Sequence, residues 1–186
     1  MKKWQLLQSH PVLTHRWCQV RRDEVQLPNG EIVDDFFVNV RPDIALVLAV
    51  TDDREIVFVR QYRHGVGEIL LELPAGGFDR AREDAEAAAA RELTEETGYV
   101  AERLTKLATF YDNPVKDTNQ LHLFLARDVV LMEKQQLDRT EEIEVVLVPI
   151  AQVESKIKSG EICVSGTVTA LFLGLASLEV HSPLIE

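Results

Sequence analysis

The stretch from Gly77 to Tyr99 constrains the fold of this chain more than any other. Its centre places Glu92, Glu95 and Glu96 at positions i, i+3 and i+4. On a helix this spacing brings all three carboxylates to one face, where like charges repel. Carboxylate oxygens at this density suit Mg²⁺, which takes one or two carboxylates and completes its shell with water and phosphate oxygens. A solvated acidic face is the commoner meaning of such a charge run, so the surrounding sequence has to decide.

The residues around the three acids form a pattern with fixed spacing. Its fixed positions are Gly77, Glu83, Arg91, Glu92, Leu93, Glu95, Glu96 and Gly98. This pattern resembles the signature of the Nudix hydrolases, and chance agreement over so many specified positions is improbable. Tyr99 departs from the signature because it occupies the last aliphatic position, which is a packing position.

The same segment predicts a helix without any resemblance. The polar run Asp79–Asp84 is a loop that leads into Ala85–Ala90, a run of strong helix formers. Gly98 stands where a left-handed C-terminal cap is expected. Ala88 and Ala89 lie on the same side as the acids, so the helix can approach a sheet closely and hold the carboxylates against it.

Composition limits the classes of function. The chain has 186 residues, which suits one domain with a small N-terminal appendage. Its net charge of −11 argues against sequence-independent nucleic-acid binding, which relies on a basic surface. A small anionic substrate remains compatible with this charge if a divalent metal ion neutralises the site locally.

Cysteine use and hydropathy bear on location. Cys18 and Cys163 belong to no metal-binding or redox motif, so we expect buried free thiols and a cytoplasmic protein. Lys2 and Lys3 are followed by no apolar run, which argues against a signal peptide. The longest apolar stretch, Ala170–Leu178, is too short to span a membrane, and no membrane partner is expected.

Periodicity and turn signals predict mixed strands with few helices, an α+β fold arranged as an α/β/α sandwich. The Pro28-Asn29-Gly30 turn should join two N-terminal strands, and the strands at 44–50 and 55–61 should pair as a hairpin. Residues 74–77 are expected to form a loop. The expected strands are 17–27, 31–39, 44–50, 55–61, 69–73, 104–110, 120–126 and 143–148, and two helices should follow the signature helix at 151–159 and 167–178.

The resemblance implies the Nudix fold, a mixed sheet between helices, with an N-terminal antiparallel strand extension. It places a β-hairpin extension at 1–40 and the Nudix hydrolase domain at 41–186. Such an extension implies a homodimer with exchanged N-terminal strands. Trp17, Phe36 and Phe37 could stack on a base, but we favour an interface or core role for at least two of them.

The flanks of the signature resemble one branch of the family. Arg60–Arg63, the run Glu72–Gly76 and Pro114 match features of Nudix hydrolases that cleave ADP-ribose and other nucleoside diphosphate sugars. This resemblance implies a small-molecule nucleotide sugar, such as ADP-ribose or GDP-mannose, that is hydrolysed to a nucleoside monophosphate and a sugar phosphate. Alternatives are a nucleoside triphosphate or dinucleoside polyphosphate pyrophosphatase, and a non-catalytic ADP-ribose sensor, against which the complete set of acids argues.

The resemblance also implies roles in metal binding. Mg²⁺, or Mn²⁺ in its place, would be held by Glu92, Glu95, Glu96 and the carbonyl of Ala75. Glu83 would complete or orient this shell, and Arg91 would fix the rotamers of the acids or form an ordinary surface pair. Gly77, Glu83, Arg91 and Gly98 are the structural residues of the signature.

Hydrolysis also needs a general base and phosphate contacts. Glu95 and Glu96 are catalytic candidates on the helix, but in this branch the base often lies on a loop before a late strand. Glu141 occupies that place and is preferred to Glu142, although an acidic loop without a catalytic role is equally compatible. The residues expected to contact substrate, each of which could instead be ordinary surface or loop charge, are Arg60, Arg63, Glu72 and Lys116.

Overall fold

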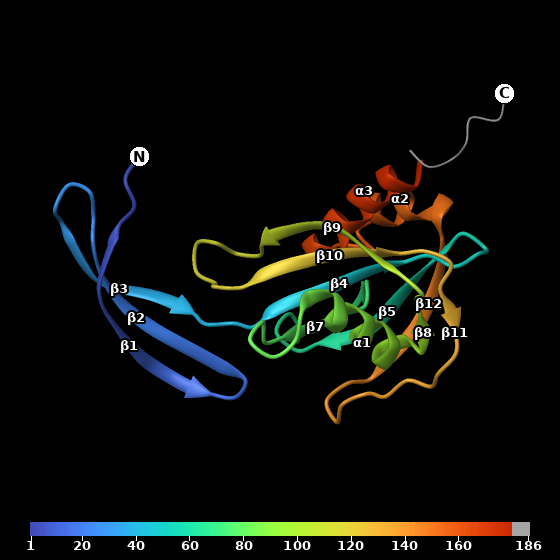
Figure 1. Cartoon of the computed structure of the whole chain (residues 1–186), viewed down its shortest axis with the longest axis horizontal. Coiled ribbons are helices and arrows are strands. Elements are labelled where there is room, and N and C mark those ends of the chain that lie inside the picture. Colours follow the sequence, from blue (N-terminus) through green and yellow to red (C-terminus); the bar gives the residue numbers. More distant parts are fainter. Residues whose placement is uncertain (180–186) are drawn as a thin grey trace. The chain divides into compact units, whose positions relative to one another are not determined.

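The computed structural model describes residues 1–179, and it divides the chain into two compact units (Figure 1). One unit contains Met1–Asp43 together with Tyr111–Gln120. The other contains Ile44–Phe110 and the chain from Leu121 onwards. The chain therefore leaves the N-terminal unit, builds part of the second unit and returns once to the first.

The N-terminal unit is built on an antiparallel sheet in the order β1-β2-β3. Its strands are β1 (Gln5–His15), β2 (Cys18–Gln26) and β3 (Ile32–Asn39). The predicted pairing of β2 and β3 is present, and β1 pairs with β2 as a further antiparallel strand. The strand β1 was not predicted, because every residue of it is exposed, so no buried face marks it, and Pro11 interrupts it.

Residues 111–120 are tied to the end of β3. The backbone N–H of Asn39 donates to the carbonyl of Lys116 at 2.8 Å, and the Asn39 side chain donates to Asp117 at 2.7 Å. Arg41 donates to the other carboxylate oxygen of Asp117 at 3.1 Å. The hydrogen bonds from Asn39 and Arg41 hold the pKa of Asp117 below its usual range.

The remaining strands form three sheets and, apart from one end residue each of β4, β9 and β10, lie in the second unit. A mixed sheet runs in the order β7-β4-β10-β9, an antiparallel sheet in the order β12-β5-β6, and β11 pairs with β8. The strands are β4 (Asp43–Ala49), β5 (Glu55–Arg63), β6 (Glu68–Glu72), β7 (Ala75–Phe78), β8 (Tyr99–Val100), β9 (Leu104–Tyr111), β10 (Gln120–Ala126), β11 (Val130–Leu131) and β12 (Ile143–Pro149). The helices are α1 (Ala85–Thr97), α2 (Ile150–Lys158) and α3 (Ser165–Glu179).

Two local predictions are wrong. The strands β4 and β5 do not form a hairpin, because β4 already has β7 and β10 as neighbours and meets β5 only at a single bridge between Val50 and Ile56. Residues 74–77 are not an open loop, since Ala75 begins the edge strand β7. That strand brings glycine backbone alongside α1.

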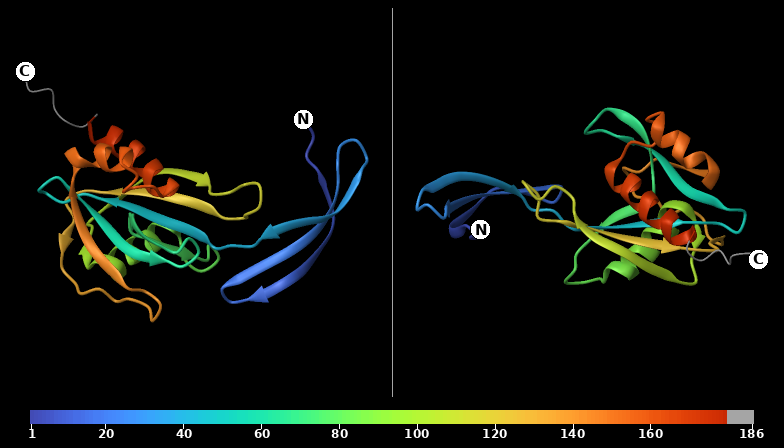
Figure 2. Two further views of the ribbon diagram at one scale, coloured as in Figure 1. Left: turned by 180° about the vertical axis from the view of Figure 1, so that it is seen from behind. Right: turned by 90° about the horizontal axis from the view of Figure 1, so that it is seen from above.

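The core confirms the α+β sandwich. Leu46 and Leu48 of β4 face a cluster that includes Leu171 of α3, whereas Ala45 and Val47 face a cluster that includes residues of α1. Side chains along a strand alternate between its faces, so β4 is buried on both sides. Figure 2 shows α1 on one side of this sheet and α2 and α3 on the other.

Both ends of α1 are capped, and Gly98 provides the C-terminal cap as predicted. The side chain of Asp84 accepts a hydrogen bond from the backbone N–H of Ala87 at 2.8 Å. Gly98 adopts the left-handed conformation with φ of 75°, and its N–H donates to the carbonyl of Thr94. These caps fix where the acidic face of the helix begins and ends.

The expectation of buried thiols is wrong, because Cys18 and Cys163 are both free and exposed. Within residues 1–179, no helix is both long enough and apolar enough to cross a membrane.

We expect the contact between α1 and the sheet to be intolerant of bulk. Ala89 is fully buried, whereas Ala90 beside it is exposed. Ala89→Leu should lower the free energy of unfolding by about 1–3 kcal/mol through overpacking, measured by urea unfolding. The matched variant Ala90→Leu should change it by less than about 0.5 kcal/mol, and equal effects would contradict this account of the packing.

Candidate active site

The acidic face of α1 borders a cavity of about 130 Å³. Glu141 reaches the same cavity from the segment between β11 and β12, whereas Glu142 is not among its lining residues. The lining consists of Arg91, Glu92, Glu95, Glu96, Gln136, Asp138 and Glu141. The structure thus brings the three acids of the signature helix together with the loop residue that sequence favoured.

Glu96 is the most deeply buried of these acids, at 5% exposure. Burial raises the pKa of Glu96 to about 8, against the opposing effect of a hydrogen bond from the Ala75 N–H. That N–H donates to the Glu96 carboxylate at 3.0 Å. The negative charges of Glu92 and Glu141 raise the pKa of Glu96 further. The site therefore concentrates negative charge that only a cation or a proton can offset.

Glu92 lies against the backbone of β7. Burial raises the pKa of Glu92, the neighbouring Arg91 opposes this shift, and Glu95 and Glu141 add to it. A Cβ atom at Gly76 would lie 2.0 Å from the Glu92 carboxylate, so only glycine lets the strand and the acid approach this closely.

Arg91 connects the acids of the signature. Its guanidinium donates to both carboxylate oxygens of Glu83, at 3.1 and 3.0 Å. It also donates to Glu92 at 2.7 Å and to Glu95 at 2.9 Å. These partners, Glu83 foremost, raise the pKa of Arg91 far above its usual range. Glu83 is bound to Arg91 and does not line the cavity.

The basic candidates separate into two groups. Arg63 donates to the largely buried Glu72 at 2.6 Å, and its positive charge lowers the pKa of Glu96 slightly. It does not itself line the acidic cavity. Arg60 instead pairs with Glu144 at 2.8 Å, with both side chains exposed. Lys116 belongs to the N-terminal unit and does not line the acidic cavity.

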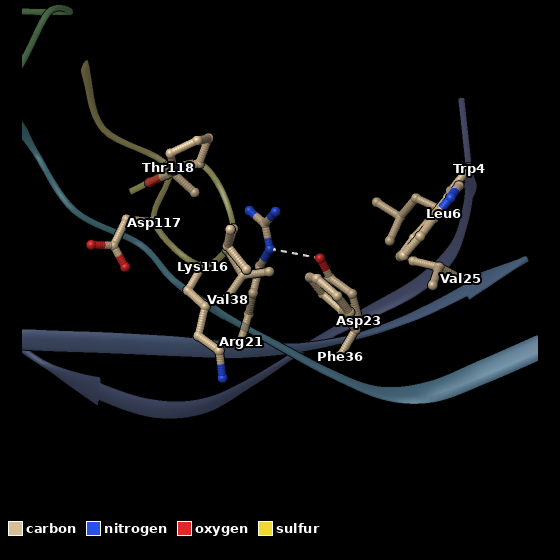
Figure 3. Close-up of a pocket in the computed structure, with 12 residues that line it drawn as sticks. Trp4, Leu6, Arg21, Asp23, Val25, Phe36, Val38, Lys116, Asp117 and Thr118 are labelled. Carbon is tan, nitrogen blue, oxygen red and sulfur yellow. Dashed lines mark hydrogen bonds and ion pairs between the residues drawn. The ribbon is translucent and has the colours of Figure 1, made fainter. Parts of the chain in front are cut away.

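The N-terminal unit contains a larger cavity of about 340 Å³, shown in Figure 3. Trp4 meets Phe36 edge-to-face in its lining, with ring centroids 5.7 Å apart. Arg21 donates to the buried Asp23 at 3.0 Å, and Lys116 also lines this cavity. We place the chemistry in the smaller cavity because five acidic residues line it, whereas this one is lined largely by apolar groups and paired charges.

Sequence reasoning missed the neighbours of Glu141 in this part of the structure. Gln136 and Asp138 line the cavity, and the side chain of Gln135 donates to the carbonyl of Glu96 at 2.6 Å. No periodicity or spacing marks these residues, because they lie in an irregular segment. Only the tertiary fold brings them to α1.

The donor set fits a hard divalent cation. Among residues 1–179, no three acidic, histidine or cysteine side chains are arranged to hold one ion by themselves. Mg²⁺ does not require such a set, because it takes one or two protein carboxylates and fills its other positions with water and substrate phosphate. The mutual repulsion of Glu92, Glu96 and Glu141 is the electrostatic condition that such an ion would relieve.

Comparison with known proteins agrees with this geometry. Residues 40–164 match the NUDIX domain, so the chain belongs to the Nudix family. Residues 4–39 match the nucleoside diphosphate sugar hydrolase N-terminal domain. The protein is therefore a Nudix hydrolase of the α+β class, a family that uses a divalent metal ion.

Relatives with named activities cover most of the chain. An ADP-ribose pyrophosphatase from Bacillus subtilis is 38% identical over 80% of this chain and 80% of its own length. Another from Mycobacterium tuberculosis is 32% identical over 86% of this chain and 77% of its own length. The crystal structure of an ADP compounds hydrolase has a TM-score of 0.85 at 24% identity, covering 97% of this chain and 96% of that one, which shows the shared fold.

We predict that Glu96 destabilises the metal-free protein at high pH. A carboxyl whose pKa is raised by folding stabilises fully below its unfolded value of 4.5, and this contribution is lost as the pH rises towards 8. In chelator at pH 9, Glu96→Gln should increase the free energy of unfolding by on the order of 3 kcal/mol. At pH 4 the variant and the wild type should agree.

Urea unfolding at both pH values measures this difference. The exposed Glu102→Gln is the control and should match the wild type throughout. A Glu96→Gln variant that is less stable than the wild type at pH 9 would contradict the assigned cost of ionising Glu96.

Proposed function

We propose that this protein hydrolyses the diphosphate linkage of a nucleoside diphosphate sugar, and ADP-ribose is the leading candidate for its substrate. The products would be a nucleoside monophosphate and a sugar phosphate. The observation that carries the proposal is the cavity in which Glu92, Glu95 and Glu96 meet Glu141. The names of both relatives, and the match of residues 4–39 to the N-terminal domain of nucleoside diphosphate sugar hydrolases, support this substrate class.

We propose Mg²⁺, or Mn²⁺ in its place, as the metal, held by Glu92, Glu95, Glu96 and the carbonyl of Ala75. When bound, this ion neutralises diphosphate oxygens and makes phosphorus more electrophilic. Arg91 supports the ligands by fixing the carboxylates of Glu92 and Glu95 through its hydrogen bonds. Glu83 in turn orients Arg91, and Gly77 and Gly98 shape the two ends of the segment.

The reaction consumes one water molecule. Its oxygen forms a bond to one phosphorus, the bond from that phosphorus to the bridging oxygen breaks, and the bridging oxygen leaves with the other phosphate. The water proton goes to a base, for which we propose Glu141. The alternative base, Glu96, is instead assigned to the metal in this proposal.

The loop presents the Glu141 carboxylate in a defined position. One carboxylate oxygen of Glu141 accepts the backbone N–H of Asp138 at 2.9 Å, and the Glu141 N–H donates to the Asp138 carbonyl at 2.9 Å. The other carboxylate oxygen takes no part in this pair. A preorganised base of this kind is what proton transfer from water requires.

Among the basic candidates, we propose Arg63 as the phosphate contact, because its charge acts on Glu96 while Glu72 orients it. A guanidinium that keeps free N–H groups can still donate to phosphate oxygens. Arg60 and Lys116 stay predictions, because Arg60 is paired with the exposed Glu144 and Lys116 lies in the N-terminal unit.

A substrate panel tests the proposal. With Mg²⁺, wild-type protein should convert ADP-ribose to AMP and ribose phosphate, followed by chromatography, and chelator should abolish the reaction. GDP-mannose, nucleoside triphosphates and dinucleoside polyphosphates complete the panel, and cleavage of triphosphates alone would replace this proposal. Tight binding of ADP-ribose without turnover would instead support a sensor.

The base is tested on the same substrate. Glu141→Gln should lower kcat by about a hundredfold or more, because the water proton loses its acceptor. The matched variant Glu142→Gln should stay within about twofold of the wild type, since Glu142 does not line the cavity. Unchanged turnover in Glu141→Gln would exclude Glu141 as the base.

We further propose a homodimer joined through the N-terminal extension at residues 1–40, with the hydrolase domain at 41–186. The match of residues 4–39 and 40–164 to two family domains supports this division. All eleven residues of β1, including Leu13, are exposed, and so are Trp17 and Phe37. A three-stranded sheet gains stability when its apolar face packs against another surface. We propose that a second copy of the chain provides this surface.

The dimer is tested by light scattering. The double variant Leu13→Asp with Phe37→Asp should shift the protein from dimer to monomer at micromolar concentration, because it puts charge into an apolar interface. The control Asp35→Asn, on the same strand as Phe37, should stay dimeric. A wild-type monomer would remove the exchanged-strand proposal.

We also propose a cytoplasmic location. The exposed free thiols of Cys18 and Cys163 are compatible with a reducing compartment.

A further inference from the structure

The segment that carries Glu141 is joined to the C-terminal end of α1. The last carbonyl groups of a helix have no partner within the helix. Here the loop backbone provides partners: the N–H of Gln136 donates to the carbonyl of Glu95 at 2.8 Å, and the N–H of Glu133 donates to the carbonyl of Gly98 at 3.1 Å. The helix that presents the signature acids is therefore capped by the same loop that presents Glu141.

Gly98 makes this closure sterically feasible. A Cβ atom at position 98 would lie 2.3 Å from the carbonyl oxygen of Glu133, and the residue also has a positive φ of 75°. A larger residue would push the loop away from the helix. The glycine that closes the signature thus serves the loop as well as the helix cap.

Gln135 holds this loop at two points. Its side-chain Nε2 donates to the carbonyl of Glu96 at 2.6 Å and to the carbonyl of Ile143 at 3.2 Å. A primary amide carries two N–H groups, so both carbonyls can be satisfied by one side chain. Glu96 lies in the last turn of α1, and Ile143 is the first residue of β12.

These two bonds bracket the residues that carry the base. Gln135 precedes the loop tip and Ile143 follows it, so one amide holds both ends of residues 136–142 beside Glu96. The tip is closed independently by the reciprocal pair of Asp138 and Glu141. The place of the Glu141 carboxylate relative to Glu96 therefore depends on the side chain of Gln135.

We infer that Gln135 is a positioning residue for the hydrolysis, which sets the Glu141 carboxylate against the acidic face of α1. This inference rests on the proposed function. Gln135 acts through Glu141 and needs no contact with substrate. Its contribution is geometric, since misplacement of a reacting group by about 1 Å can cost on the order of a hundredfold in rate.

The variant Gln135→Met removes both donors and keeps the length of the side chain. Hydrogen exchange at the backbone amides of Asp138 and Glu141 should accelerate by at least about tenfold, because the loop opens more often. Gln152→Met, at an exposed position on α2, is the matched control and should leave these amides unchanged. Circular dichroism verifies the fold, and Gln135→Asn, one methylene shorter, serves as a milder variant if the methionine variant does not fold.

Turnover supplies the second readout. With ADP-ribose and Mg²⁺, Gln135→Met should lower kcat by about tenfold to a hundredfold and leave KM within about twofold. In a Glu141→Gln background the same substitution should lower kcat by less than about twofold, because the group it positions is already absent. A residue that only supports the fold would lower kcat equally in both backgrounds.

Four results would overturn the inference. Unchanged hydrogen exchange at the amides of Asp138 and Glu141 would show that Gln135 does not hold the loop, whatever the activity. An equal loss of kcat with and without Glu141 would show that Gln135 acts by another route. A wild-type protein that hydrolyses no nucleoside diphosphate sugar would overturn the proposed function, and the catalytic role of Gln135 with it. Full activity in Gln135→Met would overturn the positioning role of Gln135 alone.

Discussion

The organisation of this site depends on the cost of gathering negative charge on a helix face that packs against a sheet. Burial and mutual repulsion raise the pKa values of Glu92 and Glu96. Arg91 offsets part of this cost, because its guanidinium contacts carboxylates on both sides of it in sequence. What remains uncompensated is a local excess of negative charge beside a backbone N–H. A protein retains such an arrangement when a bound cation is part of its working state.

Small residues make this concentration of charge sterically feasible. The buried alanines Ala88 and Ala89 seat α1 on the sheet, and Gly76 lets β7 run directly past Glu92. At the far end of the helix, Gly98 admits the loop. Each position needs a small residue for a different neighbour: sheet side chains, a carboxylate and a carbonyl group. The spacing of glycine and acid in the signature thus reflects packing as much as chemistry.

The sequence predicted the parts of the molecule that depend on local rules. The helix formers of Ala85–Ala90 and the cap residue Gly98 marked α1, because propensities and caps act over a few residues. Strand pairing failed at β4 and β5, since the pairing is decided by which strands already occupy the edges of β4. The role of Gln135 was equally invisible, because its acceptors are backbone carbonyls eight and thirty-nine positions away. Every residue has a backbone carbonyl, so the sequence does not indicate which of them accepts a side-chain hydrogen bond.

The return of residues 111–120 to the N-terminal unit has an evolutionary consequence. Asp117 accepts hydrogen bonds from Asn39 and Arg41. It lies in the connection between β9 and β10, which is part of the hydrolase domain in the sequence but of the N-terminal unit in the structure. A recombination event that replaced only the first forty residues would remove Asn39, which donates hydrogen bonds to Lys116 and Asp117 of this connection. The N-terminal extension and the β9–β10 connection are therefore expected to be inherited as a coupled pair, and chimaeras of related enzymes should exchange both segments together.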